Sequence, residues 1–322
     1  RAKMRALLNS DTHRKLDIIN QLIEKTNADI VIHAGDFGFY DETSYQHLSS
    51  RELLLLITHS PYRNEYSLDK ADKETLVEIV KKHHLLGDFD DYLNQRKKFQ
   101  KPVYAVYGNH EDVGVIRKLK ANPIMNFHLL DEDNIYSINE NKELAFRVFG
   151  LGGNFLVGQK MLNQPIAGSS GKVWATLHQF GVLYQKLEDK TKPSVFVSHV
   201  SPGKEPLLTR LMIHFMPNFW VSGHMGAPYT CVWNQFTIRE MDESIAWFGS
   251  QLNKLDALQL DNATSEAKLA IELIKRQVQR DEFWFKKMWN VNLPDAKDGC
   301  AVLNYDNGRF CLEQLVSDTW FE

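Results

Sequence analysis

The chain has 322 residues, of which 43% are hydrophobic and 25% are charged, and its formal net charge is −3. This composition is typical of a globular protein and excludes a disordered, fibrous or membrane-spanning chain. The small negative charge provides no global positive field that would attract nucleic acid. No apolar run approaches the ~18 residues that a membrane span needs, and no apolar segment follows the first charges to form a signal peptide. We therefore expect a cytoplasmic protein without a membrane partner.

Five short apolar runs along the chain each end in a cluster of polar residues. They span residues 4–9, 30–33, 103–107, 194–197 and 219–222. Runs of this length that are rich in valine, isoleucine and aromatic residues predict buried strands. Between the first two runs, residues 16–23 have apolar positions at helical spacing, which predicts a βαβ unit. The sequence therefore predicts an α/β fold whose ligands bind beyond the carboxyl ends of the strands.

Two polar stretches with helical patterns interrupt the strands, at about residues 41–101 and 242–293. The clearest helices of the first stretch are expected at residues 73–83 and 90–98, and the second contains a helix that begins at Thr264. The chain has no internal repeat and no linker rich in proline or glycine. We therefore expect a single domain, residues 1–322, with two helical insertions.

The chain then returns to strands at residues 299–305 and 309–316. The Asn-Gly pair at residues 307–308 predicts a two-residue β-hairpin between them. In that register Cys300 and Cys311 are not cross-strand partners. We expect buried free thiols in a reduced chain.

The polar residues at the strand ends are of the types that bind transition metals. Asp11 and His13 are two residues apart, so their side chains point to the same face at the end of the first strand. The other four clusters contribute Asp36, Asn109, His199 and His224. Taken singly, each of these residues is more often a capping group at a strand end. Together they form a mixed nitrogen and oxygen set that suits manganese, iron or zinc.

The order of these clusters, Asp-x-His, Gly-Asp, Gly-Asn-His-Glu, His and Gly-His, resembles the calcineurin-like metallophosphoesterase superfamily from Met4 to about Pro228. That resemblance implies a two-sheet α/β sandwich flanked by helices, with the closing hairpin in the second sheet. It also implies two divalent metal ions, for which manganese is our first choice. Asp11 and His13 would hold the first metal and Asp36 would bridge both. The residues implied for the second metal are Asn109, His199 and His224.

The activity that the resemblance implies is hydrolysis of a phosphoric ester, with a hydroxide between the metals for in-line attack on phosphorus. A phosphodiester is favoured over a monoester, and the substrate would be a small phosphate ester or a nucleotide. His110 matches the family's histidine beside the scissile phosphate and is our candidate general acid; a supporting hydrogen bond is its alternative role. Glu111 or Asp41 would orient it, or else serve as surface or capping carboxylates.

Two weaker candidates for substrate contacts are Arg14 and Asn154. Arg14 directly follows the Asp-x-His motif and is in reach of a phosphate, although a surface salt bridge is the commoner role for such a residue. Asn154 lies in a glycine-rich loop after the strand expected at residues 145–149. That loop fails as a dinucleotide-binding fingerprint, because no amphipathic helix or correctly spaced acidic residue follows it.

Two departures qualify the resemblance, and one further signal lies outside it. Gly226 stands where the family has the second histidine of Gly-His-x-His, a ligand of the first metal, and its loss weakens that site. It leaves open a degenerate member that binds a nucleotide, a phosphate or a partner with little turnover. The residues after Asp36 lack the acidic residue and the arginine of protein serine/threonine phosphatases, which disfavours that subfamily. Basic and aromatic residues alternate near 275–289, where an amphipathic helix is favoured over a nucleic-acid site.

Overall fold

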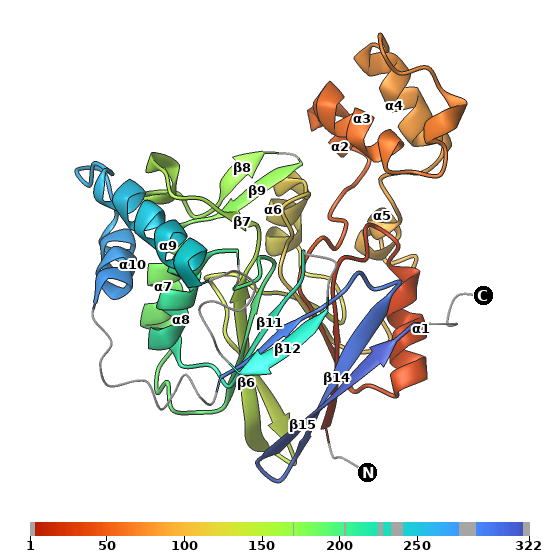
Figure 1. Ribbon diagram of the computed structural model, residues 1–322. Coiled ribbons are helices and arrows are strands. Elements are labelled where there is room, and N and C mark those ends of the chain that lie inside the picture. Colours follow the sequence, from red (N-terminus) through yellow and green to blue (C-terminus); the bar gives the residue numbers. More distant parts are fainter. Residues whose placement is uncertain are drawn as a thin grey trace.

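The computed structural model describes residues 4–169, 171–202, 204–224, 228–232, 241–276 and 288–317. Two six-stranded sheets pack against each other, and helices cover the outer face of each sheet (Figure 1). A third, three-stranded sheet is formed by β7 (Asn154–Phe155), β9 (Lys172–Ala175) and β8 (Ala167–Ser169). The two-sheet α/β sandwich flanked by helices is therefore confirmed.

The first sheet joins strands from the two ends of the chain. In spatial order they are β15 (Arg309–Val316), β14 (Gly299–Asp306), β1 (Met4–Asn9), β2 (Ile30–His33), β3 (Val103–Ala105) and β4 (Phe127–Leu129). Strands β1 to β4 are parallel, whereas β14 pairs antiparallel with β1. The expectation that the closing hairpin lies in the second sheet is therefore wrong, because β14 pairs with β1 and extends the first sheet.

The turn between β14 and β15 has the conformation that the Asn-Gly pair predicts. Asn307 and Gly308 both have positive φ, 49° and 80°, as a type I′ hairpin turn requires. Cys311 faces Asn304, so the predicted register is confirmed and the two cysteines of the hairpin are not partners. Both thiols are free; Cys300 is buried as expected. Cys311 is exposed, which corrects the expectation of burial, because β15 is the edge strand of the sheet.

The second sheet contains the strands predicted at residues 145–149, 194–197 and 219–222. In spatial order its members are β12 (Tyr229–Val232), β13 (Trp289–Asn292), β11 (Phe219–Ser222), β10 (Ser194–Ser198), β6 (Glu143–Leu151) and β5 (Tyr136–Glu140). Strands β6, β10, β11 and β13 are parallel, with antiparallel strands at both edges. Strand β13 corrects the prediction of a helical stretch as far as residue 293: its backbone pairs with both β11 and β12.

Alternate residues of the central strands supply separate hydrophobic cores. Ala6 and Leu8 of β1 belong to the core between the two sheets, whereas Leu7 packs with Ile19 and Leu22 of the first helix on the outer face. Each such buried side chain contributes about 1.5–3 kcal/mol to stability. Both faces of the parallel strands are thereby fixed, which leaves the strand ends as the positions that present polar side chains.

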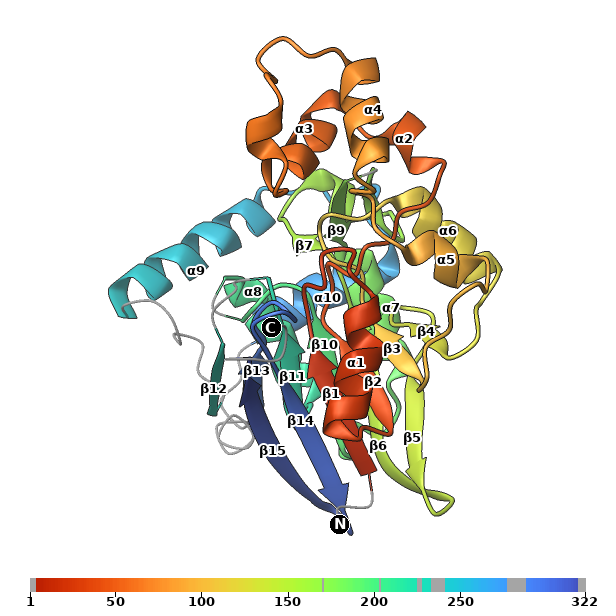
Figure 2. The ribbon, with the colours of Figure 1, turned by 90° about the vertical axis from the view of Figure 1, so that its right-hand side faces the viewer.

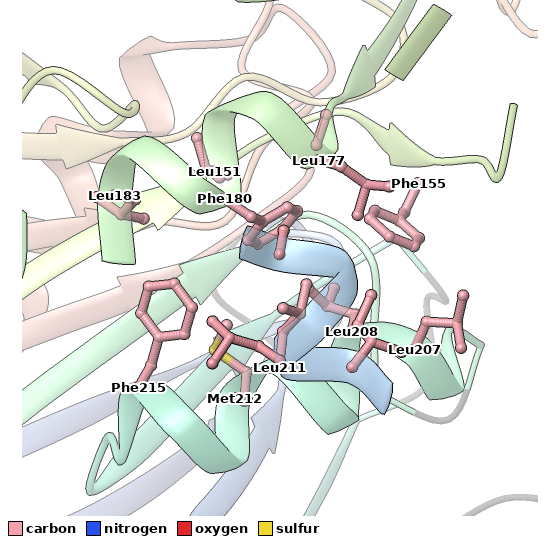
Figure 3. Packing of buried hydrophobic residues seen from close by; sticks show 14 of the residues in the cluster. Leu151, Phe155, Leu177, Phe180, Leu183, Leu207, Leu208, Leu211, Met212 and Phe215 are labelled. Carbon is pink, nitrogen blue, oxygen red and sulfur yellow. The ribbon is translucent and has the colours of Figure 1, made fainter. Parts of the chain in front are cut away.

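Five helices cover the two outer faces. The first sheet is covered by α1 (Asp17–Thr26) and α6 (Val113–Ala121), and the second by α7 (Leu177–Lys186), α8 (Pro206–Phe215) and α10 (Ser265–Lys275). Figure 3 shows Phe180 and Leu183 of α7 facing Leu211 and Phe215 of α8. Outside this layer, α9 (Met241–Asp256) packs on α8 (Figure 2). No helix in the described ranges combines the length and the apolar character that crossing a bilayer requires.

The helix predicted from Thr264 is confirmed as α10. The Thr264 hydroxyl caps it by accepting a hydrogen bond from the Ala267 amide at 3.1 Å, which satisfies one of the free amides at the helix start. Of the basic and aromatic segment near 275–289, residues 277–287 lie outside the described ranges. The amphipathic helix that we favour for that segment therefore stays a prediction, with the nucleic-acid site as its alternative.

The first predicted insertion contains four α-helices and one short 3₁₀ helix. They are α2 (Ser44–His47), α3 (Ser50–Thr58), η1 (Arg63–Glu65), α4 (Lys73–Lys82) and α5 (Phe89–Leu93). Helices α2, α3 and α4 stand apart from the sheets (Figures 1 and 2) and have a small core of their own, which includes Leu53, Ile57, Leu76 and Val80. Helix α5 ends before the predicted residue 98, because Gln95 adopts a positive φ of 59° that stops it.

Candidate metal centre

The loops after β1 and β2 hold three candidate ligands in an unusual backbone conformation. Asp11, His13 and Asp36 have φ values of 51°, 45° and 49°. For residues other than glycine this left-handed region costs about 1–2 kcal/mol each. The two loops hold each other there: the Asp11 amide donates to the Gly35 carbonyl at 2.9 Å, and the His13 amide donates to the Asp36 carbonyl at 3.1 Å. Strain maintained by such mutual support is characteristic of functional sites.

A first group of donor atoms lies at the end of β1. One ligand atom each from Asp11, His13 and Asp295 lies within 4.8 Å of the others. His13 Nε2 is 3.3 Å from Asp295 Oδ2 and 4.0 Å from Asp11 Oδ1. The sequence predicts Asp11 and His13 but not Asp295, which lies three residues after the end of β13. If residues 289–292 had been predicted as a strand, Asp295 would have been identified as another carboxylate near a strand end.

A second group lies between the ends of β2, β3, β10 and β11. Ligand atoms of Asp36, His199 and His224 lie within 4.8 Å of one another. His199 Nε2 is 3.6 Å from Asp36 Oδ1 and 2.9 Å from Asn109 Oδ1. The structure thus brings all six predicted ligands together in two adjacent groups. The His224 amide links them by donating to Asp11 Oδ2 at 3.0 Å.

The surroundings of His199 test whether the second group fits a metal ion. Its Nδ1 lies 2.8 Å from the Ala34 carbonyl oxygen, which only accepts hydrogen bonds, so Nδ1 carries the hydrogen. The other ring nitrogen, Nε2, faces the oxygens of Asn109 and Asp36. A cation among these three atoms would take a lone pair from each of them. A metal-binding histidine typically donates its other N–H to a backbone carbonyl in this way. The residues present therefore fit a metal.

Burial and neighbouring charges set the ionisation of the group. Burial opposes the charge of Asp36, but the nearby imidazoles, His199 above all, hold its pKa below the usual value. Burial, followed by the effect of His199, lowers the pKa of His224 to about 3, so this ring is neutral at pH 7 and keeps a lone pair for a ligand. Burial raises the pKa of Asp11. Asp36 as a carboxylate and His224 as a neutral imidazole are therefore in the forms that bind metals.

His110 follows Asn109 at the edge of the second group. Its backbone is fixed on both sides, because its amide donates to Asp36 Oδ1 at 3.2 Å and its carbonyl accepts from the Tyr40 hydroxyl at 2.7 Å. The residue is exposed. The predicted orienting carboxylates have other partners: Glu111 is buried and accepts from the Gly38 and Phe39 amides, and Asp41 pairs with Lys118 at 2.6 Å.

The predicted substrate contacts lie on different sides of the centre. Arg14 is half-buried and lines a cavity of about 1090 Å³ together with residues of α1 and of the first insertion. Asn154 opens β7, next to the loop after β3, because the Gly153 amide donates to the Tyr107 carbonyl at 2.8 Å. Both residues stay predictions as substrate contacts. Gly226, where the family pattern has a histidine, lies outside the described residues.

The family profile described as calcineurin-like phosphoesterase matches residues 4–228, which is more than half of the chain. The chain belongs to the calcineurin-like phosphoesterase family. The matched region contains all six predicted ligands, whereas Asp295 lies beyond it. No curated protein sequence matches the chain significantly.

Several solved structures resemble this calcineurin-like phosphoesterase at low sequence identity. TT1561 of Thermus thermophilus is 12% identical, with a TM-score of 0.47 over 97% of this chain and 98% of that chain. GAP50, the anchor in the inner membrane complex of Plasmodium, is 9% identical, with a TM-score of 0.47 over 99% and 86%. The NAD nucleotidase NadN of Haemophilus influenzae is 13% identical, with a TM-score of 0.37 over 97% of this chain and 50% of its own.

Gly108 provides a test of how closely the loops of the centre pack. A Cβ atom at this position would lie 1.9 Å from Asp36 Oδ1 and 2.2 Å from the Asp36 amide nitrogen. We expect Gly108→Ala to displace Asp36, to weaken metal binding and to lower the free energy of unfolding by about 1–3 kcal/mol, the usual cost of overpacking. Chemical denaturation and metal analysis measure both effects.

The matched control is Gly158→Ala, because a Cβ there would meet no atom within 4 Å. We expect this variant to keep the stability and the metal content of the original protein. A Gly108→Ala protein that equals the control in both respects would contradict the close packing of the two loops around Asp36.

Proposed function

We propose that this protein is a metal-dependent phosphoric-ester hydrolase and that phosphodiesters are its preferred substrates. The observation that carries the proposal is the pair of adjacent donor groups, one around Asp11 and one around Asp36. Membership of the calcineurin-like phosphoesterase family supports the same chemistry. Asp11 and His13 would hold one divalent ion, Asn109, His199 and His224 would hold a second, and Asp36 would lie between them.

Manganese is the first choice for both ions, with iron and zinc as alternatives, because the donor set mixes imidazole nitrogens with carboxylate and amide oxygens. When bound, such ions supply an activated water molecule and positive charge beside the phosphoryl oxygens. The protein's own part is to hold the carboxylates and imidazoles in place. The strained loops of Asp11 and Asp36, locked to each other through backbone hydrogen bonds, serve that purpose.

The proton that the leaving group needs would come from His110. Water that has released one proton to solvent would attack as hydroxide; as its oxygen bonds to phosphorus and the bond to the leaving oxygen breaks, a protonated His110 would give its proton to that oxygen and later regain one from solvent. Its backbone is fixed at both the amide and the carbonyl, whereas the residue is exposed and therefore accessible to a substrate. This combination supports the assignment of His110 as the general acid.

The cavity beside the centre supports a substrate with a second substituent on phosphorus. It has a volume of about 1090 Å³ and runs from Arg14 and Tyr40 between α1 and the insertion. Acidic residues along it are engaged in ion pairs, as Asp17 is with Lys97 at 2.8 Å. A diester leaves one organic group attached to phosphorus after hydrolysis, and the cavity would accommodate that group while Arg14 contacts the phosphate.

The proposal is tested with metal-stripped protein and two chromogenic substrates, bis-p-nitrophenyl phosphate and p-nitrophenyl phosphate. We expect no turnover without metal, recovery on titration with Mn²⁺, and a higher kcat/KM for the diester. Faster hydrolysis of the monoester would overturn the diester preference. Binding of Mn²⁺ without turnover of either substrate would support the alternative of a phosphate-binding or partner-binding member of the family.

A further inference from the structure

The residue of the centre that lies outside the family match is Asp295. Its Oδ2 lies 3.3 Å from His13 Nε2, on the side of the first donor group. We propose that Asp295 is a ligand of the first metal, supplied by the C-terminal part of the chain. This inference rests on the proposed function, because it assigns a further ligand to the same centre. In the family pattern, the first metal has a histidine ligand at the sequence position that Gly226 occupies in this chain. Asp295 would supply a donor in place of that missing histidine.

The fold brings Asp295 to this place through two strand pairings. Strand β13 is parallel to β11, with Asn292 beside Ser222, so it ends at the same edge of the second sheet as β11, the strand before His224. After the turn, β14 pairs antiparallel with β1, with Ala301 opposite Leu8. The turn that carries Asp295 therefore passes from one sheet to the other at the end of β1, beside Asp11 and His13.

The turn itself is fixed by backbone hydrogen bonds. The Leu293 amide donates to the Ser222 carbonyl at 2.7 Å. The Asp295 carbonyl accepts from the Asp298 amide at 2.8 Å and from the Gly299 amide at 3.2 Å. Because the backbone on both sides of Asp295 is held in this way, its carboxylate is presented to His13 by a rigid segment. Such preorganisation favours metal binding.

The distance between His13 and Asp295 suits two ligands of one ion better than a direct hydrogen bond. Two ligand atoms that each lie about 2.1 Å from an ion are about 3.0 Å apart at an octahedral angle and about 3.4 Å apart at a tetrahedral angle. The 3.3 Å between His13 Nε2 and Asp295 Oδ2 falls in that interval. It exceeds the usual N–H···O distance of about 2.9–3.0 Å. The side chains of His13 and Asp295 are 45% and 26% exposed, so water can complete the coordination.

The test is Asp295→Asn, which keeps the size of the side chain and removes its charge. Metal-stripped protein is titrated with Mn²⁺ by isothermal calorimetry, and the coupling between the two ions is followed by electron paramagnetic resonance. We expect the Mn²⁺ affinity of one of the two sites to fall at least tenfold, which is on the order of the effect of substitutions around a metal site. The other site is expected to keep its affinity, and the signal of the coupled pair should be lost at limiting Mn²⁺.

Two further variants separate a ligand from a structural residue. Asp298→Asn removes a charge from the same turn at an exposed position, and we expect it to bind Mn²⁺ as the original protein does. Asp295→Glu keeps the carboxylate but places it one methylene further from the backbone. The Mn²⁺ affinity of this variant should fall between those of the original protein and Asp295→Asn. Thermal unfolding of the metal-free forms verifies that each variant is folded.

The outcomes distinguish this inference from the proposed function. If Asp295→Asn and Asp295→Glu bind two Mn²⁺ ions as tightly as the original protein, Asp295 is only a neighbour of His13 and the inference fails alone. If the original protein binds no Mn²⁺, the proposed function fails as well. A loss of affinity in Asp298→Asn equal to that in Asp295→Asn would show a general effect of charge and would also overturn the assignment.

Discussion

Asp36→Asn is expected to eliminate turnover and to release both metal ions together. The carboxylate of Asp36 acts on both donor groups: its Oδ1 lies 3.6 Å from His199 Nε2 in the second group, and its charge adds to burial in raising the pKa of Asp11 in the first. Removal of its charge should therefore weaken the binding of both ions at once. Metal analysis after reconstitution with Mn²⁺, together with the diesterase assay, measures the effect.

The substitution is informative because asparagine suits the backbone at this position. Asp36 has a φ of 49°, and asparagine is among the residues that adopt positive φ most readily. The Asn oxygen also keeps an acceptor for the His110 amide, which lies 3.2 Å from Asp36 Oδ1. Loss of metal is thus attributable to the lost charge and not to misfolding. Asp133→Asn, which removes an exposed partner of Lys120, is the control and should retain both ions. Two ions retained by Asp36→Asn would refute the bridging role.

The predictable part of the fold is the part that local pattern determines. Residues 4–9 and 30–33 are apolar throughout or nearly so, and both are buried strands because helices and the second sheet cover their two faces. The hairpin register follows from Asn307 and Gly308 alone, since a two-residue turn fixes which residues face each other. The same locality explains why the sequence suggests all six candidate ligands: each lies within four residues of the end of a strand that a local apolar pattern predicts.

What the sequence does not reveal depends on contacts between distant segments. Residues 289–292 alternate tryptophan, asparagine and valine and have no strong strand signal; they form β13 because β11 and β12 offer backbone partners on both sides. The closing hairpin likewise belongs to the first sheet because β14 pairs with β1, and these two strands come from opposite ends of the chain. Asp295 was missed for this reason, because its role depends on where β13 ends.

The insertion shows a different limit of the sequence. The polar, helical character of the insertion can be predicted from its sequence. The separate core around Leu53 and Leu76 cannot, because it depends on tertiary packing. Strands β2 and β3, which flank the insertion in the chain, pair directly with each other. We therefore propose that α2 to α4 are an addition to one continuous domain. Their place after the end of β2 puts them beside the cavity that Arg14 lines.

The second large effect is expected from His110→Ala, which should lower the maximal rate for an alkyl ester by about 10²–10⁴-fold, the usual contribution of a general acid or base. Both metal ions should remain bound. The amide hydrogen bond of residue 110 to Asp36 and the carbonyl contact with Tyr40 belong to the backbone, so alanine preserves them. The ring that alanine removes belongs to an exposed residue, so stability should change little.

The leaving group distinguishes a proton donor from other roles of His110. An alkoxide leaving group needs a proton as its bond to phosphorus breaks, whereas p-nitrophenolate leaves without one because its conjugate acid is far stronger. We therefore expect the loss of rate in His110→Ala to be large for an alkyl ester and small for a p-nitrophenyl ester of the same phosphate. Rates for the two esters and metal content are measured side by side. Equal losses for both esters would contradict the general-acid role, and loss of metal would instead make the His110 ring a ligand.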